Sequence, residues 1–355
     1  MRVIQLLSSK ILVGPNVIGH ESANLPELGL RRAFVLTDRN CLKYARRVEQ
    51  SLKAGGVETE ISALPAGEVT KSLSTAGRIH QQLARSGMDR KSGLFAVGGG
   101  VITDLGGFVA STYMRGIKVC LYPTTLLGQV DAAIGGKTGV NLPQGKNLVG
   151  TFYQPALVFC DPTVLKTLPD REYVSGLGEV VKYGMIRDAT LFEYIDRNLA
   201  GIRSRDPEIL DEIVHRCAAI KADVVTKDEK ESGERAILNY GHTIGHALEA
   251  AGNFKTLHHG EAVSIGMEAE AILSMELGIA PLEVLAAQNR VLKLCGLPTR
   301  VKKMPEKKVL AALRLDKKNV SGRTRFVLPE AVGKVRWGVE VPSDLIAAAL
   351  RTVTS

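Results

Sequence analysis

Short apolar runs alternate with longer stretches of helical period through the first half of the chain. The runs with the pattern of buried strands are residues 33–38, 57–63, 94–97, 119–122 and 157–160. Helical patterns at 42–53 and 72–84 separate the first three runs, and glycines follow both patterns. Strands that alternate with helices predict an α/β fold, with a parallel sheet wrapped by helices. Ligands of such sheets bind beyond the carboxyl ends of the strands.

The pattern changes near Asp161-Pro162. Residues 170–312 have helical period almost throughout, which predicts a second domain made of helices. A short β pattern returns at 325–329, and a terminal helix follows from Ser343. A chain of 355 residues that is 45% apolar can form two cores. We therefore predict a parallel-sheet domain over residues 1–168 and an all-α domain over residues 169–355.

The composition narrows the class of protein. Five scattered cysteines without a CxxC motif are typical of reduced thiols in the cytoplasm. The first residues lack the apolar stretch of a signal peptide, and no apolar run has the length of a membrane span. We therefore expect a soluble, cytoplasmic protein. The net charge of +9 comes from dispersed side chains, which argues against nucleic-acid binding and suits a small polyanionic substrate or an ordinary solvated surface.

Histidines and glycines cluster between residues 239 and 261. His242 and His246 lie one turn apart in Gly-His-Thr-Ile-Gly-His, and His258-His259 follow. Imidazoles grouped in this way, with a third donor from elsewhere, bind a divalent metal and leave positions open for a substrate. Spacing does not decide which of them are ligands. The glycines, which cost about 1 kcal/mol each in a helix, indicate close approach of a ligand or of another backbone.

Glu179 is a candidate for the third donor. It lies with Lys182 on a helical pattern whose flanking residues are apolar, so we expect a largely buried helix. A buried carboxylate needs a cation, and a metal would serve. The alternative is a surface ion pair between Glu179 and Lys182.

Glycine-rich turns supply candidate anion sites. Residues 98–104 follow a strand and open a helix, where backbone N–H groups favour a phosphate, although a plain tight turn explains the glycines equally well. Residues 131–147 contain Gly-Gly-Lys-Thr, but Asp131 stands where a P-loop has its first glycine. Lys137, Lys146 and Asn147 in this segment suit a phosphate or a carboxylate.

Two charged segments have the pattern of solvated turns and helix ends. They are residues 228–235 and 316–318, and we accept that interpretation for most of their members. Lys221 lies in an apolar stretch and is therefore a better functional candidate.

Several long blocks together carry a resemblance to a known family. They are GGGVITDLGGFVASTYMRGI (98–117), PTTLLGQVDAAIGGKTGVNLPQGKNLVGTFYQP (123–155), GLGEVVKYGMI (176–186), NYGHTIGHALE (239–249), HGEAVSIGM (259–267) and DKKN (316–319). Along almost its whole length, the chain resembles the 3-dehydroquinate synthases of the shikimate pathway. The resemblance implies a Rossmann-like N-terminal domain that binds NAD, an α-helical C-terminal domain, and a zinc or cobalt ion in the cleft between them.

The resemblance also implies roles for individual residues. The implied metal ligands are Glu179, His242 and His259, and the implied catalytic residues are His246 and Glu231, for proton transfer, with Lys137 and Lys182. The implied NAD contacts are Asp38, Glu68, Val69, Thr70, Lys71, Gly99, Gly100, Val101, Asp104, Thr124, Thr125, Lys146, Val164, Leu165, Lys166 and Thr167. The implied substrate contacts are Arg115, Asp131, Lys137, Asn147, Lys182, Lys221, Arg235, Asn239, His246 and Lys317 or its neighbour Lys318. Ser175 stands where some relatives place an asparagine that touches NAD.

The implied substrate is 3-deoxy-D-arabino-heptulosonate 7-phosphate, whose carboxylate and phosphate match the converging cations. The implied reaction is a transient oxidation by NAD, elimination of phosphate, re-reduction and intramolecular aldol closure, which makes the enzyme a lyase of aromatic amino acid biosynthesis. A homodimer is expected from the family. Three alternatives stay open: a sugar-phosphate cyclase that makes valiolone or inosose rings, a metal-dependent polyol dehydrogenase of the same superfamily, and an NAD-binding protein without catalysis.

Overall fold

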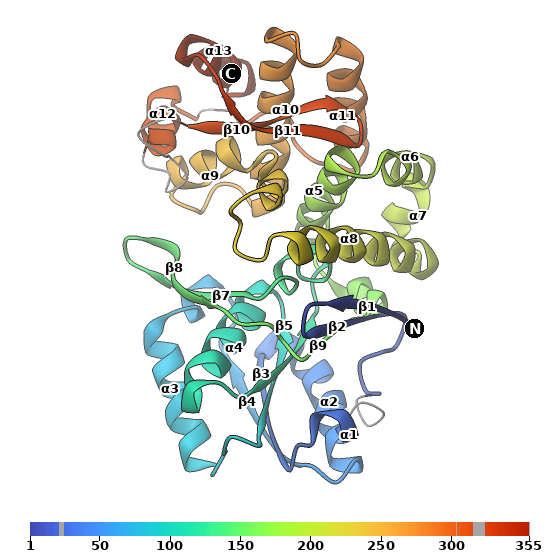
Figure 1. The fold of residues 1–355 in the computed structure, drawn as a ribbon, viewed down its shortest axis with the longest axis vertical. Helices are drawn as coiled ribbons and strands as arrows, with labels where there is room; N and C mark the ends of the chain where they lie inside the picture. Colours follow the sequence, from blue (N-terminus) through green and yellow to red (C-terminus); the bar gives the residue numbers. More distant parts are fainter. Residues whose placement is uncertain (21–24, 303, 315–323, 355) are drawn as a thin grey trace. The chain divides into compact units, whose positions relative to one another are not determined.

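The computed structural model describes residues 1–20, 25–302, 304–314 and 324–354. The chain forms two compact units (Figure 1). The first comprises Met1–Leu168 and Leu210–Thr226, and the second comprises Pro169–Ile209 and Lys227–Ser355. Residues 210–226 therefore group with the first unit. The boundary predicted from the sequence, after residue 168, places them in the second domain instead. Within the described residues, no helix is both long and apolar enough to cross a membrane.

A seven-stranded sheet forms the centre of the first unit in the described part of the chain. Its strands in spatial order are β1 (Arg2–Leu6), β2 (Ser9–Val13), β9 (Leu157–Cys160), β6 (Lys118–Pro123), β5 (Gly93–Gly98), β3 (Arg32–Asp38) and β4 (Glu58–Leu64). All neighbours pair in parallel except β1, which runs antiparallel to β2. The strands β5 and β9 are buried along their whole length, as in a sheet covered on both faces. The parallel sheet expected from the sequence is therefore present.

Helices pack on this sheet. The helical elements of the first unit are α1 (Leu25–Leu28), η2 (Arg39–Cys41), α2 (Leu42–Ala54), η3 (Glu68–Thr70), α3 (Leu73–Arg85), α4 (Gly100–Thr112), η4 (Tyr113–Arg115), η5 (Gly128–Ala132), η6 (Pro162–Thr167) and most of α8 (Pro207–Lys227). Glycines let α4 approach its neighbours on two sides. A Cβ atom on Gly106 would lie 2.6 Å from Ala96 Cβ, and one on Gly107 would lie 2.5 Å from Thr138 Cγ2.

A hairpin of β7 (Lys137–Leu142) and β8 (Gly145–Phe152) also belongs to the first unit. The sequence does not predict it, because most of its residues are partly exposed and no alternating apolar pattern marks the strands. The two strands approach closely at glycines. A Cβ atom on Gly150 would lie 2.1 Å from the Thr138 carbonyl oxygen. The segment that we interpreted as turn-rich is therefore a paired ladder.

The second unit is mostly helical. Its elements are α5 (Asp170–Ile186), α6 (Ala189–Arg197), α7 (Leu199–Ser204), η7 (Glu234–Asn239), α9 (His242–Ala251), α10 (His259–Glu276), α11 (Leu282–Leu294), α12 (Glu306–Arg314), β10 (Arg325–Ala331), β11 (Lys334–Glu340) and α13 (Ser343–Thr354). One apolar core includes Leu248 of α9, Leu273 of α10, Phe326 of β10 and Leu350 of α13, each 0% exposed.

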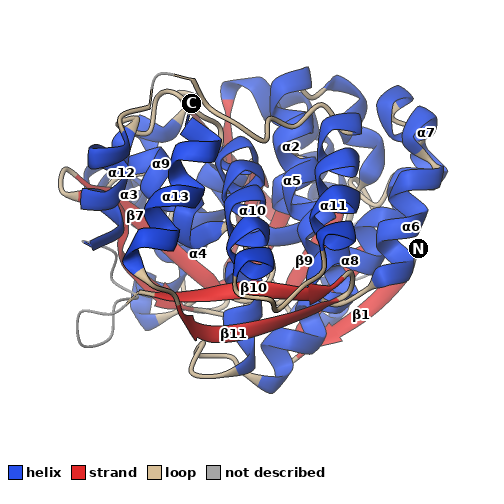
Figure 2. Ribbon diagram, turned by 90° about the horizontal axis from the view of Figure 1, so that it is seen from above, coloured by secondary structure: helices blue, strands red, loops and turns tan. Residues whose placement is uncertain are grey.

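The prediction of an all-α second domain is wrong in one respect. Strands β10 and β11 form an antiparallel hairpin, which Figure 2 shows running alongside α10. The sequence indicates only β10, because β11 exposes most of its side chains and carries no apolar run. A short strand that is exposed along most of its length gives little periodic signal.

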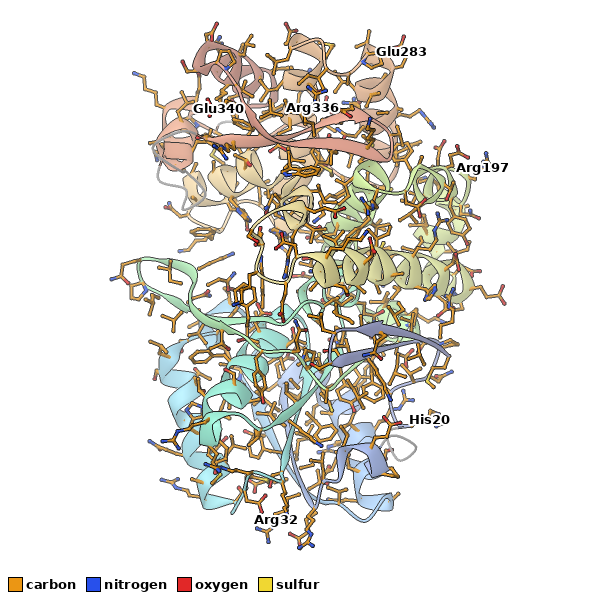
Figure 3. All side chains as sticks on the ribbon, in the orientation of Figure 1. His20, Arg32, Arg197, Glu283, Arg336 and Glu340 are labelled. Atoms are coloured by element: carbon orange, nitrogen blue, oxygen red, sulfur yellow. The ribbon has the colours of Figure 1, made fainter. Side chains whose placement is uncertain are left out.

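Charged side chains are spread over the surface, as Figure 3 shows for Arg32 and Arg197. Arg32 pairs with Glu58 at 2.8 Å and Arg197 with Glu193 at 3.0 Å. The two arginine side chains are 43% and 76% exposed. Solvated ion pairs of this kind contribute little stability, so at these positions the basic residues fit the ordinary surface considered above.

Glycines set the spacing of α5, α9 and α10. Those in backbone contact are Gly178, Gly241, Gly245, Gly260 and Gly266. A Cβ atom on Gly260 would lie 1.7 Å from the Ser175 carbonyl oxygen, and one on Gly266 would lie 1.9 Å from the Gly241 carbonyl oxygen. No side chain fits in either place. The glycines that flank the histidines therefore mark the close approach of another backbone, which is one of the two alternatives drawn from the sequence.

We predict that Gly260→Ala destabilises the protein by about 3 kcal/mol, because the Ser175 carbonyl is backbone and cannot rotate away from the added methyl group. Gly77→Ala in α3 is the matched control, since nothing lies within 4 Å of a Cβ atom there. That change should stabilise the protein by up to about 1 kcal/mol through helix propensity. Urea unfolding of the two variants checks both values, and equal stabilities would contradict the packing argument.

Candidate active site

Three donor atoms meet in the second unit. Glu179 lies within α5, His242 begins α9 and His259 begins α10. Glu179 Oε1 is 3.4 Å from His242 Nε2 and 3.3 Å from His259 Nε2. One donor atom from each of the three residues lies within 4.8 Å of the others. The glycine contacts between these helices make this convergence possible.

This donor set fits a divalent metal ion. Ligands at about 2.1 Å from a tetrahedral zinc ion are separated by about 3.4 Å, which agrees with the two distances from Glu179. The Glu179 side chain is 0% exposed, and neither carboxylate oxygen makes a hydrogen bond of ordinary geometry within the described residues. Such a carboxylate is stable only beside positive charge. One carboxylate and two imidazoles also leave a coordination position open for a substrate.

Hydrogen bonds on the far side of each imidazole orient the two rings. His242 Nδ1 lies 3.0 Å from the Tyr240 carbonyl oxygen, and His259 Nδ1 lies 3.3 Å from Glu249 Oε2. A ring that donates from Nδ1 to such an acceptor presents its Nε2 lone pair to a metal. Both Nε2 atoms therefore face Glu179, and the partners of the Nδ1 atoms favour the tautomer that a ligating imidazole adopts.

Lys182 supplies a positive charge beside Glu179. Its ammonium group pairs with Glu179 Oε2, and the residue is 1% exposed, so the pair is buried and the alternative of a surface ion pair is wrong. Burial raises the pKa of Glu179, but Lys182 and the imidazoles outweigh burial and hold that pKa well below its usual value. Burial lowers the pKa of His259, but the Glu179 and Glu249 carboxylates raise it to about 10. A metal ion would displace that proton, because a ligating imidazole is neutral.

The other two histidines of the cluster occupy different places. The His246 ring centroid is 5.3 Å from that of His242 and 6.0 Å from that of His259. His258 precedes α10, with Nδ1 3.5 Å from Glu172 Oε1. The structure therefore places His246 beside the donor cluster, whereas the His258 ring contacts a different carboxylate.

The residues predicted to contact NAD lie in the first unit, mostly after the carboxyl ends of parallel strands. Asp38 ends β3, Glu68–Lys71 follow β4, Gly99–Asp104 follow β5 and open α4, Thr124 and Thr125 follow β6, and Val164–Thr167 lie in η6 after β9. Because neighbouring parallel strands point the same way, these segments share one edge of the sheet. Dinucleotides bind at this edge in open α/β sheets.

Ion pairing organises part of that edge. Lys71, which is 5% exposed, pairs with Asp104 at the start of α4. Burial raises the pKa of Asp104, and Lys71 opposes the shift. The Asp38 carboxylate accepts backbone N–H groups of Asn40 at 2.8 Å and Cys41 at 3.2 Å. The carboxylates and the lysine are thus held in place by local contacts.

Two residues depart from this arrangement. Lys146, a predicted NAD contact, lies on β8 of the hairpin rather than after a strand of the main sheet. Ser175, which aligns with an NAD-contacting asparagine in some relatives, lies in the second unit and is 2% exposed. Its hydroxyl accepts the Gly260 N–H at 2.9 Å. Ser175 therefore contributes to the packing of α5 against α10.

Five of the predicted substrate contacts lie in the first unit. Lys221 Nζ donates to Asp131 Oδ1 at 2.7 Å and to the Asp131 carbonyl oxygen at 2.6 Å, so the structure brings these two residues together. Lys137 begins β7, and Asn147 lies on β8. Arg115 ends η4 with a φ of 68°, a left-handed conformation that is uncommon for residues other than glycine.

The remaining predicted substrate contacts lie in the second unit. Besides Lys182 and His246, they include Arg235 and Asn239 of η7. Arg235 is 2% exposed, and Asn239 Nδ2 donates to Glu231 Oε1 at 2.7 Å. Lys317 and Lys318 lie outside the described residues.

Glu249 and Tyr240, which orient the imidazoles, are not among the site residues predicted from the sequence. Glu249 lies three residues after His246, at the end of the matching block 239–249. A carboxylate on the same helix face as this histidine is the feature that could have identified it from the sequence. Tyr240 contributes a backbone carbonyl, which no residue pattern reveals.

We predict that Glu249→Ala weakens zinc binding by about 10- to 100-fold, because His259 loses the acceptor that orients its ring. Competition with a chromogenic chelator measures the affinity. Glu283→Gln, at an exposed position of α11 labelled in Figure 3, is the control and should bind zinc as the unchanged protein does. Equal affinities in the two variants would exclude this role for Glu249.

Both halves of the chain match one family. Residues 61–175 match the description "3-dehydroquinate synthase N-terminal", and residues 176–319 match "3-dehydroquinate synthase C-terminal". The 3-dehydroquinate synthase of Nostoc punctiforme is 45% identical over 350 residues, which are 97% of this chain and 96% of that protein.

Two solved structures share the fold. The 2-epi-5-epi-valiolone synthase of Streptomyces hygroscopicus subsp. jinggangensis, with NAD+ and Zn2+ bound, has a TM-score of 0.89 at 28% identity and covers 99% of this chain and 98% of its own. A 2-deoxy-scyllo-inosose synthase, complexed with carbaglucose-6-phosphate, NAD+ and Co2+, has a TM-score of 0.89 at 26% identity and covers 99% of this chain and 100% of its own. With both halves matched and a relative 45% identical along nearly all of its length, this chain belongs to the 3-dehydroquinate synthase family.

Proposed function

We propose that this protein converts 3-deoxy-D-arabino-heptulosonate 7-phosphate into 3-dehydroquinate and inorganic phosphate. The reaction is that of a carbon–oxygen lyase that depends on NAD and a divalent metal, with zinc as the expected ion and cobalt as a substitute. Family membership supports the activity. The observation that carries the chemistry is the cluster of Glu179, His242 and His259 beside Lys182, in which all but His259 are buried. A homodimer remains a prediction from the family.

The bound groups supply chemistry that side chains lack. When bound, NAD would accept and return a hydride, and the metal ion would polarise the substrate oxygen at the carbon that gives up the hydride. Glu179, His242 and His259 would hold the ion. Asp38 and Asp104, at the carboxyl edge of the sheet, would contribute to the NAD site.

Buried cations would bind the anionic groups of the substrate. Lys182 and Arg235 are 1% and 2% exposed, so water screens their charges weakly. Lys221 is 6% exposed, and Asp131 holds its ammonium group in place. Cations fixed in advance bind a carboxylate or a phosphate without the loss of side-chain freedom that flexible lysines suffer.

His246 and Glu231 would transfer protons. Donor atoms of His246, Glu249 and His259 lie within 4.8 Å of one another, so the His246 imidazole is beside the metal ligands. The Glu231 carboxylate accepts from Asn239, which fixes its orientation. Groups positioned in this way can act as general acids and bases.

A different sugar-phosphate cyclase is the alternative with support, because the two solved structures are a valiolone synthase and an inosose synthase. Sequence identity favours the dehydroquinate reaction, at 45% for the Nostoc relative against 28% and 26% for those two. A polyol dehydrogenase of the same superfamily would differ in a measurable way, because it releases NADH whereas a cyclase returns the hydride.

The first test is turnover. With heptulosonate 7-phosphate, catalytic NAD and zinc, we expect equal amounts of phosphate and dehydroquinate and no accumulation of NADH. Phosphate is measured colorimetrically and NADH by absorbance. Steady NADH production without phosphate would identify a dehydrogenase, and turnover only of sugar phosphates that lack a carboxylate would identify another cyclase.

The second test compares adjacent histidines. His259→Ala should lose bound zinc and reduce kcat by at least about 1000-fold, because one of three ligands is removed. His258→Ala is the matched control, since its ring contacts Glu172, and should keep zinc and activity. Zinc content by mass spectrometry and phosphate release give independent readouts. Zinc retained at normal affinity by His259→Ala would overturn the ligand assignment.

A further inference from the structure

Asp228 organises the segment that connects α8 to η7 in the chain. Its Oδ1 atom accepts the Ser232 N–H at 2.9 Å and the Ser232 hydroxyl at 3.2 Å. Its Oδ2 atom accepts the Gly233 N–H at 2.7 Å and the Arg235 N–H at 3.1 Å. Asp228 therefore has a structural role beyond that of a solvated helix end, the interpretation accepted above for most of its segment. One carboxylate holds the backbone of three residues.

These contacts favour the ionised carboxylate. Burial raises the pKa of Asp228, but the backbone N–H groups outweigh burial and lower it to about 2. A carboxylate that accepts several N–H bonds is stabilised in its charged form. Asp228 therefore remains an anion at any pH at which an enzyme of this kind is assayed.

The segment held by Asp228 carries three residues of the proposed mechanism. Glu231 has a φ of 60°, a left-handed conformation that costs free energy in a residue other than glycine and needs support from its surroundings. The Arg235 backbone N–H donates to the Asp228 carboxylate, and the Arg235 guanidinium group donates to the Glu229 carbonyl oxygen. Asn239 donates to Glu231 at 2.7 Å. Asp228 therefore fixes the backbone of Arg235 directly and that of Ser232, next to Glu231, whose carboxylate in turn binds Asn239.

We propose that Asp228 is a positioning residue for Arg235, Asn239 and Glu231. The proposal rests on the proposed function, which gives these three residues substrate contacts and proton transfer. Asp228 acts on the reaction through the backbone of Ser232, Gly233 and Arg235, which its two oxygens bind. This role goes beyond the residues that the family resemblance assigns.

The test is Asp228→Asn, which keeps the size of the side chain but replaces one acceptor oxygen with an NH2 group. At least one pair of donors then loses its acceptor, and the segment shifts. We expect kcat/KM for heptulosonate 7-phosphate to fall on the order of 100-fold, with a higher KM and a lower kcat, as displacements of about 1 Å can cause. Zinc content and NAD affinity should stay unchanged, because their residues lie elsewhere in the sequence. Amide hydrogen exchange should accelerate in residues 229–239.

Asp206→Ala is the control, because an asparagine at this position would still cap the helix with its amide oxygen. Asp206 also accepts two backbone N–H groups, from Glu208 at 2.9 Å and Ile209 at 3.2 Å, but at the other end of α8. Loss of this cap should lower the melting temperature as in Asp228→Asn and leave kcat/KM unchanged. The comparison separates loss of stability from loss of positioning.

The outcomes are distinct. An unchanged protein that releases no phosphate contradicts the proposed function itself. An active protein whose Asp228→Asn variant keeps kcat/KM within about twofold contradicts the positioning role. If the asparagine variant does not fold, Asp228→Glu keeps the charge and both oxygens on a longer side chain. We expect the same loss of kcat/KM from that variant, and wild-type kinetics would overturn the proposal.

Discussion

The backbone contacts among α5, α9 and α10 are the constraint on which the candidate metal site depends. Glu179, His242 and His259 come from these helices. The Nε2 atoms of His242 and His259 lie 3.4 and 3.3 Å from Glu179 Oε1. Contacts in which a Cβ atom would fall 1.7 or 1.9 Å from a carbonyl oxygen leave no room for any residue but glycine. Side chains at these positions would separate the backbones and with them the donors. The same glycine contacts therefore determine how these three helices pack and whether the three donor atoms can meet.

Burial of charge follows from that packing. Glu179 is 0% exposed and Lys182 1% exposed, and charges so far from water are stable only when they are paired. Glu249, which is 6% exposed, adds a second carboxylate behind His259. Two carboxylates face one ammonium group and two imidazoles, so a divalent cation at the Nε2 atoms would add the positive charge that this arrangement favours.

The sequence predicts several strands that are buried on both sides, although it misses β2 (Ser9–Val13), which is mostly buried. The parallel strands β3, β5, β6 and β9 are continuous apolar runs, and the turn after β5 into α4 is marked by its glycines. The hairpin β7–β8 and strand β11 escape prediction because their residues are partly exposed and lack a period.

The site was predictable only in part. Residue types indicate a metal centre near the histidine cluster, but spacing does not decide which imidazoles are ligands, and the pair one turn apart, His242 and His246, is only one of the possibilities. The structure instead brings His242 together with His259, since both begin helices that converge on Glu179. The remaining assignments come from the resemblance, and most remain predictions. Asp228 and Glu249 were missed because their partners are backbone amides or side chains of another helix, which charge patterns do not reveal.

Helix α8 has a consequence for the modularity of the chain. Its residues 210–226 group with the first unit, although the segments before and after them belong to the second. Asp211 and Glu212 hold Arg2 of the first strand, and Lys221 holds Asp131. A single cut in the polypeptide therefore cannot release two complete halves. A split version of this enzyme would therefore have to supply this helix to the fragment that contains the first unit.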